Sequence, residues 1–367
     1  MTTNTKNGKD FYNAKYTVVT VDDTVDVAKK KPVWFGTRHF VTFMLFLGMA
    51  NAYIMRTNMS VAIVAMVNHT AISNKSAEGP DSIDTECERF AVNESSHKEA
   101  DGEFVWETDV QGYVLSSFFY GYVLTQIPFG ILSKRYGNIY FLGIGMLINS
   151  LFGLLVPISA KMGIWWLLAV RFIQGLGEGP IVPCTHALLA KWIPPNERSR
   201  MGAFVYAGAQ FGTVISMPLS GLLSVSEWGW PSVFYVFGTV GTVWCVFFLL
   251  LVYEDPYSSP RIDEEERKYI QKTLGIVDGT ADPKIPWRSI LHSAPFFAIL
   301  LAHMGHNFGY ETLMTELPTY MKQILRFSIK DNGILSAMPY LAMWLFSIFI
   351  SHVADWMLSN LISLIQL

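Results

Sequence analysis

The stretch Arg171-Phe-Ile-Gln-Gly-Leu-Gly-Glu178-Gly-Pro-Ile-Val-Pro183 places two ionisable side chains inside an apolar run that extends from about residue 164 to 193. The run is long enough to cross a bilayer as a helix. An ionised side chain at membrane depth costs at least about 2.5 kcal/mol, so it persists only where it faces a protein interior or a watery pathway. Arg171 and Glu178 therefore indicate a pathway for a charged solute.

Within this run, Arg171 and Glu178 are seven residues apart, so a helix carries them on nearly the same face, about 10.5 Å apart along its axis. Burial and a nearby guanidinium act in opposite directions on a carboxyl group. Glu178 is therefore a candidate for the group that takes up a coupling proton. The alternative is a buried ion pair that only fixes helix packing. Gly175, Gly177 and Gly179 lack the preceding strand of a nucleotide-binding loop, so we interpret them as sites of close helix packing.

The composition places the whole chain in the membrane class. Hydrophobic residues make up 51% of the 367 residues and charged residues 16%, whereas a soluble domain carries roughly a quarter charged residues. The net charge of −3 and the scattered basic residues argue against a nucleic-acid partner. No spacing of nucleophiles, bases, cysteines or metal ligands predicts a catalytic residue or a metal site. We therefore expect an all-α polytopic membrane protein that is not an enzyme.

Apolar runs of bilayer-crossing length divide the chain. Residues 1–38 are polar and lack the pattern of a signal peptide, which predicts a cytosolic N-terminal tail. Residues 39–253 are predicted to form a complete six-helix lobe, residues 254–289 a cytosolic linker, and residues 290–367 an incomplete second lobe of two helices. Because the chain stops after the eighth predicted span, we expect a C-terminally truncated form. The predicted spans are about 39–68, 108–133, 139–160, 164–193, 199–225, 231–253, 290–325 and 331–354.

The loops predict the orientation. Most Lys and Arg residues outside the spans fall in the N-terminal tail and in loops on the same side, which places both ends of the chain in the cytosol. The loop at residues 69–107 is then extracellular or lumenal. Asn68, Asn74 and Asn93 each begin an N-glycosylation pattern, which is used only on that side. The Lys and Arg distribution and the glycosylation patterns therefore predict the same orientation. They do not distinguish the plasma membrane from a lysosomal or vesicular membrane.

Two further spans carry charged side chains. In the first span, Tyr53 and Arg56 are three residues apart and share a helix face. The planar five-donor fork of Arg56 suits a carboxylate or a phosphate, so its natural ligand is a small anion. The alternative is that Arg56 snorkels toward the outer surface. In the seventh span, His306 and Glu311 are secondary candidates, because a membrane histidine more often hydrogen-bonds a neighbouring helix.

Four motifs resemble those of one family. Gly130-Ile-Leu-Ser-Lys-Arg-Tyr-Gly137 resembles the loop motif of the major facilitator superfamily, and Arg171-x-x-Gln174-Gly175 resembles its fourth-helix motif. Lys191-Trp-Ile-Pro-Pro-Asn-Glu-Arg-Ser199 and Leu317-Pro-Thr-Tyr-Met321 are similar to the anion/cation symporter family, which includes sodium/phosphate cotransporters, sialin and vesicular glutamate transporters. The resemblance runs from about residue 35 to 357 and is strongest for the insect inorganic phosphate cotransporters.

This resemblance implies a major facilitator fold of twelve helices in two lobes that rock around a central site. The chain would then contain the complete N-terminal lobe and about eight helices in all. The resemblance also implies that Arg56 contacts the substrate anion, and that Tyr53, Tyr122 and Gln210 line the same cavity.

For Arg171 and Glu178 the resemblance implies a role in proton coupling. His306 stands where vesicular glutamate transporters have an arginine, and Leu115 where they have a histidine, which disfavours glutamate as the substrate. Glu311 and Glu316 replace residues that are apolar or aromatic in sialin.

From these features we predict a secondary active carrier of inorganic phosphate or organic carboxylates, in which Arg56 and Arg171 attract the anion and Glu178 carries a coupling proton. It would work by alternating access with sodium ions or protons as the coupling ion and with no other cofactor. The predicted partners are a small anionic solute and the lipid bilayer. The alternative is a truncated, non-transporting form that binds or regulates full-length carriers or associates with itself.

Overall fold

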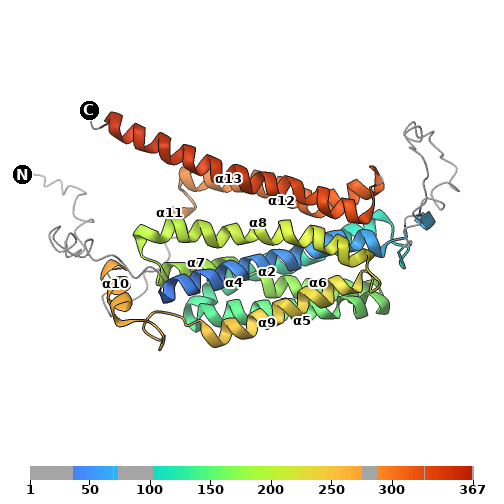
Figure 1. The fold of residues 1–367 in the computed structure, drawn as a ribbon, viewed down its shortest axis with the longest axis horizontal. Coiled ribbons are helices and arrows are strands. Elements are labelled where there is room, and N and C mark those ends of the chain that lie inside the picture. The colour runs from blue at the N-terminus through green and yellow to red at the C-terminus, as the bar shows by residue number, and fades with distance from the viewer. Residues whose placement is uncertain (1–35, 69, 73–101, 275–286, 326, 366–367) are drawn as a thin grey trace, which may run out of the picture.

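The computed structural model describes residues 36–68, 70–72, 102–274, 287–325 and 327–365, which are built almost entirely from α-helices (Figure 1). The β-structure within these residues is one isolated bridge between Val67 and Phe104. The helices are α2 (Thr37–Met66), α4 (Thr108–Tyr136), α5 (Asn138–Met162), α6 (Ile164–Glu178), α7 (Ile181–Trp192), α8 (Pro195–Val225), α9 (Pro231–Leu251), α10 (Glu264–Leu274), α11 (Trp287–Ile290), α12 (Ala294–Gln323) and α13 (Ile329–Ile365).

The helices follow the predicted apolar runs, apart from one break and differences at several helix ends. The fourth run is divided into α6 and α7 at Gly179 and Pro180. The eighth run continues as α13 to Ile365, so the expected end near residue 354 is wrong. Helix α2 begins at Thr37, inside the expected tail. By length and composition, α2, α4, α5 and α9 could each cross a membrane, and the number of eight spans therefore stays a prediction.

The break between α6 and α7 is compensated by a neighbouring helix. Pro180 has no N–H to donate to the carbonyl of Leu176, one turn earlier. The hydroxyl of Thr125, on α4, donates a hydrogen bond to that carbonyl oxygen instead, at 3.0 Å. On the same helix pair, a Cβ at Gly175 would overlap the carbonyl oxygen of Phe118. The interpretation of Gly175 as a close-packing residue is thus confirmed, and the backbones of α4 and α6 lie in contact.

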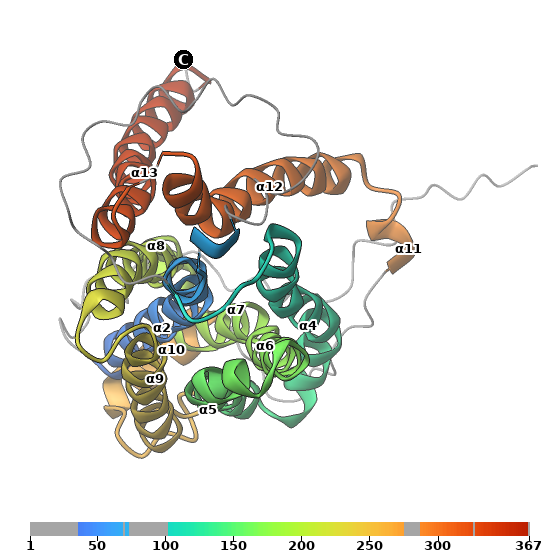
Figure 2. The same ribbon diagram turned by 90° about the vertical axis from the view of Figure 1, so that its right-hand side faces the viewer.

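Helices α2 and α4 to α9 run side by side as a bundle, and α12 and α13 lie against the α2 and α8 side of it (Figures 1 and 2). Two apolar clusters fill the bundle. One cluster includes Val41, Met44, Leu45, Met49 and Ala52 of α2, and the other includes Met55, Met59, Ala62, Ile63, Val64 and Met66 of the same helix. A third cluster joins Val61 and Met217 to Met314 of α12. The polar residues of the candidate site therefore lie between two apolar layers of the bundle.

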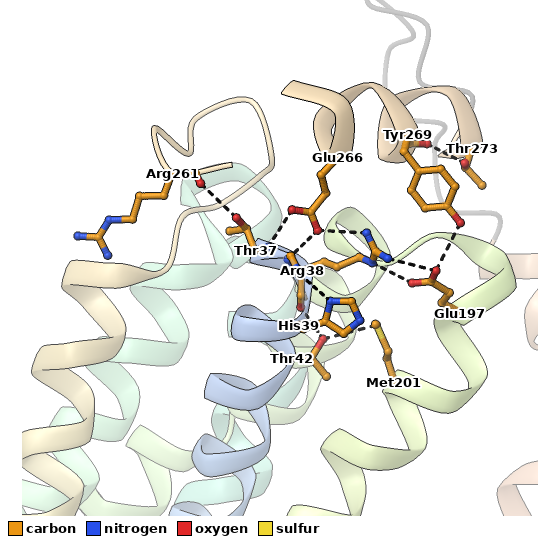
Figure 3. Close-up of polar contacts among 11 residues, drawn as sticks. Thr37, Arg38, His39, Thr42, Glu197, Met201, Arg261, Glu266, Tyr269 and Thr273 are labelled. Carbon is orange, nitrogen blue, oxygen red and sulfur yellow. Dashed lines mark hydrogen bonds and ion pairs between the residues drawn. The ribbon is translucent and has the colours of Figure 1, made fainter. Parts of the chain in front are cut away.

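Helix α10 is attached to the end of the bundle where α2 begins, which we call the α10 end (Figure 3). The Glu266 carboxylate of α10 accepts hydrogen bonds from the first two backbone amides of α2, at Thr37 (2.8 Å) and Arg38 (3.2 Å). It thereby caps the positive end of that helix. The buried Arg38 guanidinium also bonds both Glu266, at 3.2 Å, and Glu197 in the first turn of α8, at 2.9 Å. These contacts tie α2, α8 and α10 together.

A second carboxylate at the α10 end caps another helix. Glu254, just after α9, accepts hydrogen bonds from Lys191 Nζ (2.6 Å), the Asn138 side-chain amide (2.6 Å) and the Ile139 backbone N–H (3.0 Å). Burial by itself would raise the pKa of Glu254, but the three donors together hold its pKa below the ordinary value. Glu254 thus caps α5, as Glu266 of α10 caps α2.

Candidate functional site

A single buried guanidinium connects three helices. Arg56, on α2, has a side chain that is 5% exposed. Its Nε and Nη2 atoms donate to Oε1 of Glu178, at the end of α6, over 2.9 and 2.6 Å. Its Nη1 atom donates to Oε1 of Glu311, on α12, over 2.9 Å. The site therefore joins the bundle to α12 through one cation and two carboxylates.

Aromatic rings surround the same guanidinium. The Arg56 Cζ atom lies 4.8 Å from the ring centre of Tyr53 and 4.8 Å from that of Tyr122, on α4. The rings of Phe118 and Phe119 follow at 5.6 and 6.0 Å. At such distances the rings attract the cation and also exclude water from it. The two tyrosines that the sequence assigned to this cavity are thus beside Arg56, and Phe118 and Phe119 extend the aromatic wall.

The position of Glu178 is set by both of its oxygens. Oε1 binds Arg56, and Oε2 accepts a hydrogen bond of 2.8 Å from the side-chain amide of Asn149, on α5. The carboxylate is 1% exposed. Sequence reasoning missed Asn149, although an amide side chain inside an otherwise apolar span is the kind of signal that could have found it.

Arg171 does not pair with Glu178. Its Nη1 atom donates to Gln174 Oε1 at 3.1 Å, and its Cζ atom lies 5.0 Å from the ring centre of Phe118. In the described part of the chain it forms no salt bridge, and its buried Nε has no hydrogen-bond partner. The alternative of an Arg171–Glu178 ion pair is therefore wrong, because Arg56, brought in by α2, occupies that place. Gln174 in turn donates to the carbonyl of Asn149 at 3.3 Å.

The remaining candidates, Gln210 and His306, lie on α8 and α12. Gln210, on α8, is partly buried, and its Oε1 has no hydrogen-bond partner among the described residues. His306 is exposed on α12, with its ring 6.1 Å from that of Tyr310. Tyr310 contacts the site instead, because its ring lies 6.3 Å from Tyr53 and 5.4 Å from Tyr340 of α13.

Of the three expected glycosylation positions, Asn74 and Asn93 lie outside the described residues. Asn68 follows α2. Its backbone N–H donates to Phe104 and its side-chain oxygen accepts from the Ala71 amide, each at 2.8 Å.

The cluster contains two guanidinium groups and two carboxylates. If all four groups are ionised, the two positive charges of Arg56 and Arg171 balance the two negative charges of Glu178 and Glu311. Within the described residues, no group of three or more His, Cys, Asp and Glu side chains is arranged to hold a metal ion. The arrangement offers guanidinium groups that suit a small anion and carboxylates that suit a proton or a monovalent cation.

Comparisons with known proteins agree with this geometry. Residues 41–366 match the family model described as Major Facilitator Superfamily. A Drosophila melanogaster protein named "Putative inorganic phosphate cotransporter" is 69% identical over 331 residues, which cover 89% of this chain and 61% of that protein. Human sialin is 40% identical over 89% of this chain and 65% of its own length. Human vesicular glutamate transporter 2 is 34% identical over 88% of this chain and 53% of its own length.

The chain thus spans less than two thirds of the length of these relatives, and none of them is named as an enzyme. Solved structures show the same fold. A bacterial homolog of the human lysosomal transporter Spinster, inward-facing and occupied, matches with a TM-score of 0.57 and 18% identity over 83% of this chain and 58% of that one. The D-xylose-proton symporter matches with a TM-score of 0.55 and 13% identity over 86% of this chain and 68% of that one.

Proposed function

Because this chain belongs to the Major Facilitator Superfamily, and is therefore a multi-pass membrane protein, we propose that it carries the anion-binding site of a secondary active transporter. The observation that carries this proposal is the Arg56 guanidinium, buried between aromatic rings and shared by two carboxylates from α6 and α12. A buried cation of this kind, between elements of two lobes, suits a solute that is bound at mid-membrane and released by rocking of the lobes.

The substrate class that we propose is inorganic phosphate or an organic carboxylate. An arginine fork recognises either group through two parallel hydrogen bonds. The relatives named for phosphate, and sialin as a further relative, support the anionic class as a whole. Tyr53 and Tyr122 would cover the flat faces of the guanidinium, and Gln210 would offer its unpaired amide oxygen to a donor group on the substrate.

For the coupling step we propose that Glu178 carries a proton. Its carboxylate forms two of the three Arg56 contacts. Protonation would remove the charge that holds Arg56, so that the guanidinium is free to bind an external anion in the same event. A sodium ion near the carboxylates would balance the charge in the same way and is the alternative coupling ion. Arg171 would keep the surroundings of Glu178 positive, because its own charge is not paired with a carboxylate in the described part of the chain.

The orientation that we propose has the α10 end in the cytosol. Asn68 follows the opposite end of α2, where glycosylation would take place. The lysine-rich sequence before α2 supports the same direction.

The test is uptake into proteoliposomes that contain the wild-type chain or the Arg56→Gln variant. Labelled phosphate and a labelled organic carboxylate are offered under an inward proton gradient, and separately under an inward sodium gradient. We expect one anion to accumulate under one gradient, and the variant to lose the accumulation. Equal accumulation by wild type and variant would contradict the role of Arg56, and absence of any gradient-driven uptake would contradict transport by this chain.

A further inference from the structure

The two carboxylates on Arg56 are held in different ways. Glu178 is buried, and its two oxygens make three hydrogen bonds, two from Arg56 and one from Asn149. Glu311 is held by one contact with Arg56 Nη1, and its second oxygen has no hydrogen-bond partner among the described residues. Its side chain is 28% exposed. Glu178 is therefore held by more contacts than Glu311, and Glu311 is the more exposed of the two carboxylates.

Glu311 also occupies the approach to the guanidinium. The rings of Tyr53 and Tyr122 lie against Arg56, each with its centre 4.8 Å from Cζ, and Glu178 holds the Nε and Nη2 edge. The Nη1 atom, on the side of α12, is bonded to Glu311. An anion that approaches from the α12 side must therefore replace the Glu311 carboxylate.

We propose that Glu311 is a built-in competitor of the substrate. Its carboxylate holds the Arg56 Nη1 position while the protein is empty, and the substrate anion displaces it from that position. This inference rests on the proposed anion-binding function and deepens it, because it assigns to α12 a residue that sets affinity and selectivity.

Selectivity follows from the exchange of one contact for another. A single hydrogen bond from Arg56 to an anion contributes about as much free energy as the Arg56–Glu311 contact that is lost. The exchange of Glu311 for such an anion therefore has little driving force. An anion that uses two or more oxygens, or that also bonds other polar groups of the cavity, binds with a net gain. Glu311 therefore favours multidentate anions over simple monovalent ones such as chloride.

The same contact keeps the empty protein electrically balanced. Without Glu311, the described site would hold Arg56 and Arg171 against Glu178 alone. An unbalanced charge at a buried site is costly. The Arg56–Glu311 contact also joins α2 to α12, so displacing Glu311 removes one link between them.

The experiment is calorimetric titration of the full chain in lipid nanodiscs with glucuronate, a multidentate carboxylate, and separately with inorganic phosphate. The variants are Glu311→Gln, which removes the competing charge at constant size, and Glu311→Asp, which keeps the charge but shortens its reach. The matched control is Glu316→Gln, the same change at an exposed position of α12. Thermal unfolding of each variant reports whether it is folded. If Glu311→Gln does not fold, the anion affinity of Glu311→Asp relative to wild type tests the competitor role instead.

We expect Glu311→Gln to bind the anion about tenfold more tightly than wild type or better, since a hydrogen-bonded charged competitor is removed. Glu311→Asp should tighten binding less, and Glu316→Gln should leave it unchanged. If wild type binds an anion and Glu311→Gln binds it equally or more weakly, the competitor role is wrong while the proposed anion site stands. If neither wild type nor any variant binds an anion, the proposed function fails and the competitor role with it.

Discussion

The carboxylate of Glu178 lies 2.6 Å from Nη2 of Arg56, although the two residues are 122 positions apart in the sequence. Each is almost fully buried, and each depends on the other for charge balance. This contact connects Arg56, the proposed anion-binding residue, to Glu178, the proposed proton carrier. We therefore expect anion binding and protonation of Glu178 to be linked.

Geometry, and not charge alone, should decide anion affinity at Arg56. Arg56→Lys keeps the positive charge but loses the planar fork, so we expect anion affinity to fall by about tenfold or more. The matched change Arg171→Lys should reduce affinity by less than about threefold, because Arg171 bonds Gln174 and lies beside Phe118, outside the shared carboxylate contacts. Calorimetric titration of both variants checks this. A larger loss of anion affinity with Arg171→Lys than with Arg56→Lys would indicate that Arg171, and not Arg56, binds the anion.

The cap on α2 should contribute measurably to stability. Glu266→Gln removes a buried charge from Arg38 and weakens the bonds to two helix amides, so we expect the free energy of unfolding to fall by about 2 kcal/mol or more. Glu264→Gln, on the same helix, serves as control. It removes an exposed pair with Lys268 and should leave stability unchanged. Equilibrium unfolding in detergent compares the three proteins, and equal stability of Glu266→Gln and wild type would show that α10 is not held by this contact.

Acid should weaken the α10 end through Glu254. Burial acts to raise the pKa of this carboxyl, but hydrogen bonds from Lys191, Ile139 and Asn138 bring it below its ordinary value of 4.5. A lowered pKa in the folded state gives stability that is fully present above the pKa of the unfolded state, near 4.5, and is lost as the pH falls through the lower folded value.

We therefore expect the unfolding temperature of wild type to fall more steeply below about pH 4.5 than that of Glu254→Gln, which has no carboxyl to protonate. Above that pH the variant should be the less stable protein, because it lacks the charged acceptor. Thermal unfolding at a series of pH values measures both effects. Parallel curves for the two proteins would mean that Glu254 adds no pH-dependent stability.

The sequence was sufficient to locate the helices and the central residues. Uninterrupted apolar runs define helices by their length, and a charge inside such a run is conspicuous, which is why Arg56, Glu178 and Glu311 were found. The aromatic neighbours Tyr53 and Tyr122 followed from the family resemblance, and the structure brings both to Arg56.

The pairing of these residues could not be predicted from spacing. Arg171 and Glu178 share a helix face, yet the partner of Glu178 is Arg56 from another helix, a contact that depends on how α2 packs. His306 illustrates a second limit. Helix α12 is apolar around most of its circumference, so its sequence does not reveal which side faces the site, and Tyr310 rather than His306 meets Tyr53.

Counting the protons taken up during anion binding shows whether binding at Arg56 is linked to protonation of Glu178. The full chain in nanodiscs is titrated in weak buffer with an organic carboxylate that stays ionised at the assay pH. We expect wild type to take up about one proton per bound anion, and Glu178→Gln to bind the anion without proton uptake, since the neutral amide already imitates the protonated acid. Anion binding without proton uptake by wild type, or unchanged uptake by Glu178→Gln, would contradict the account.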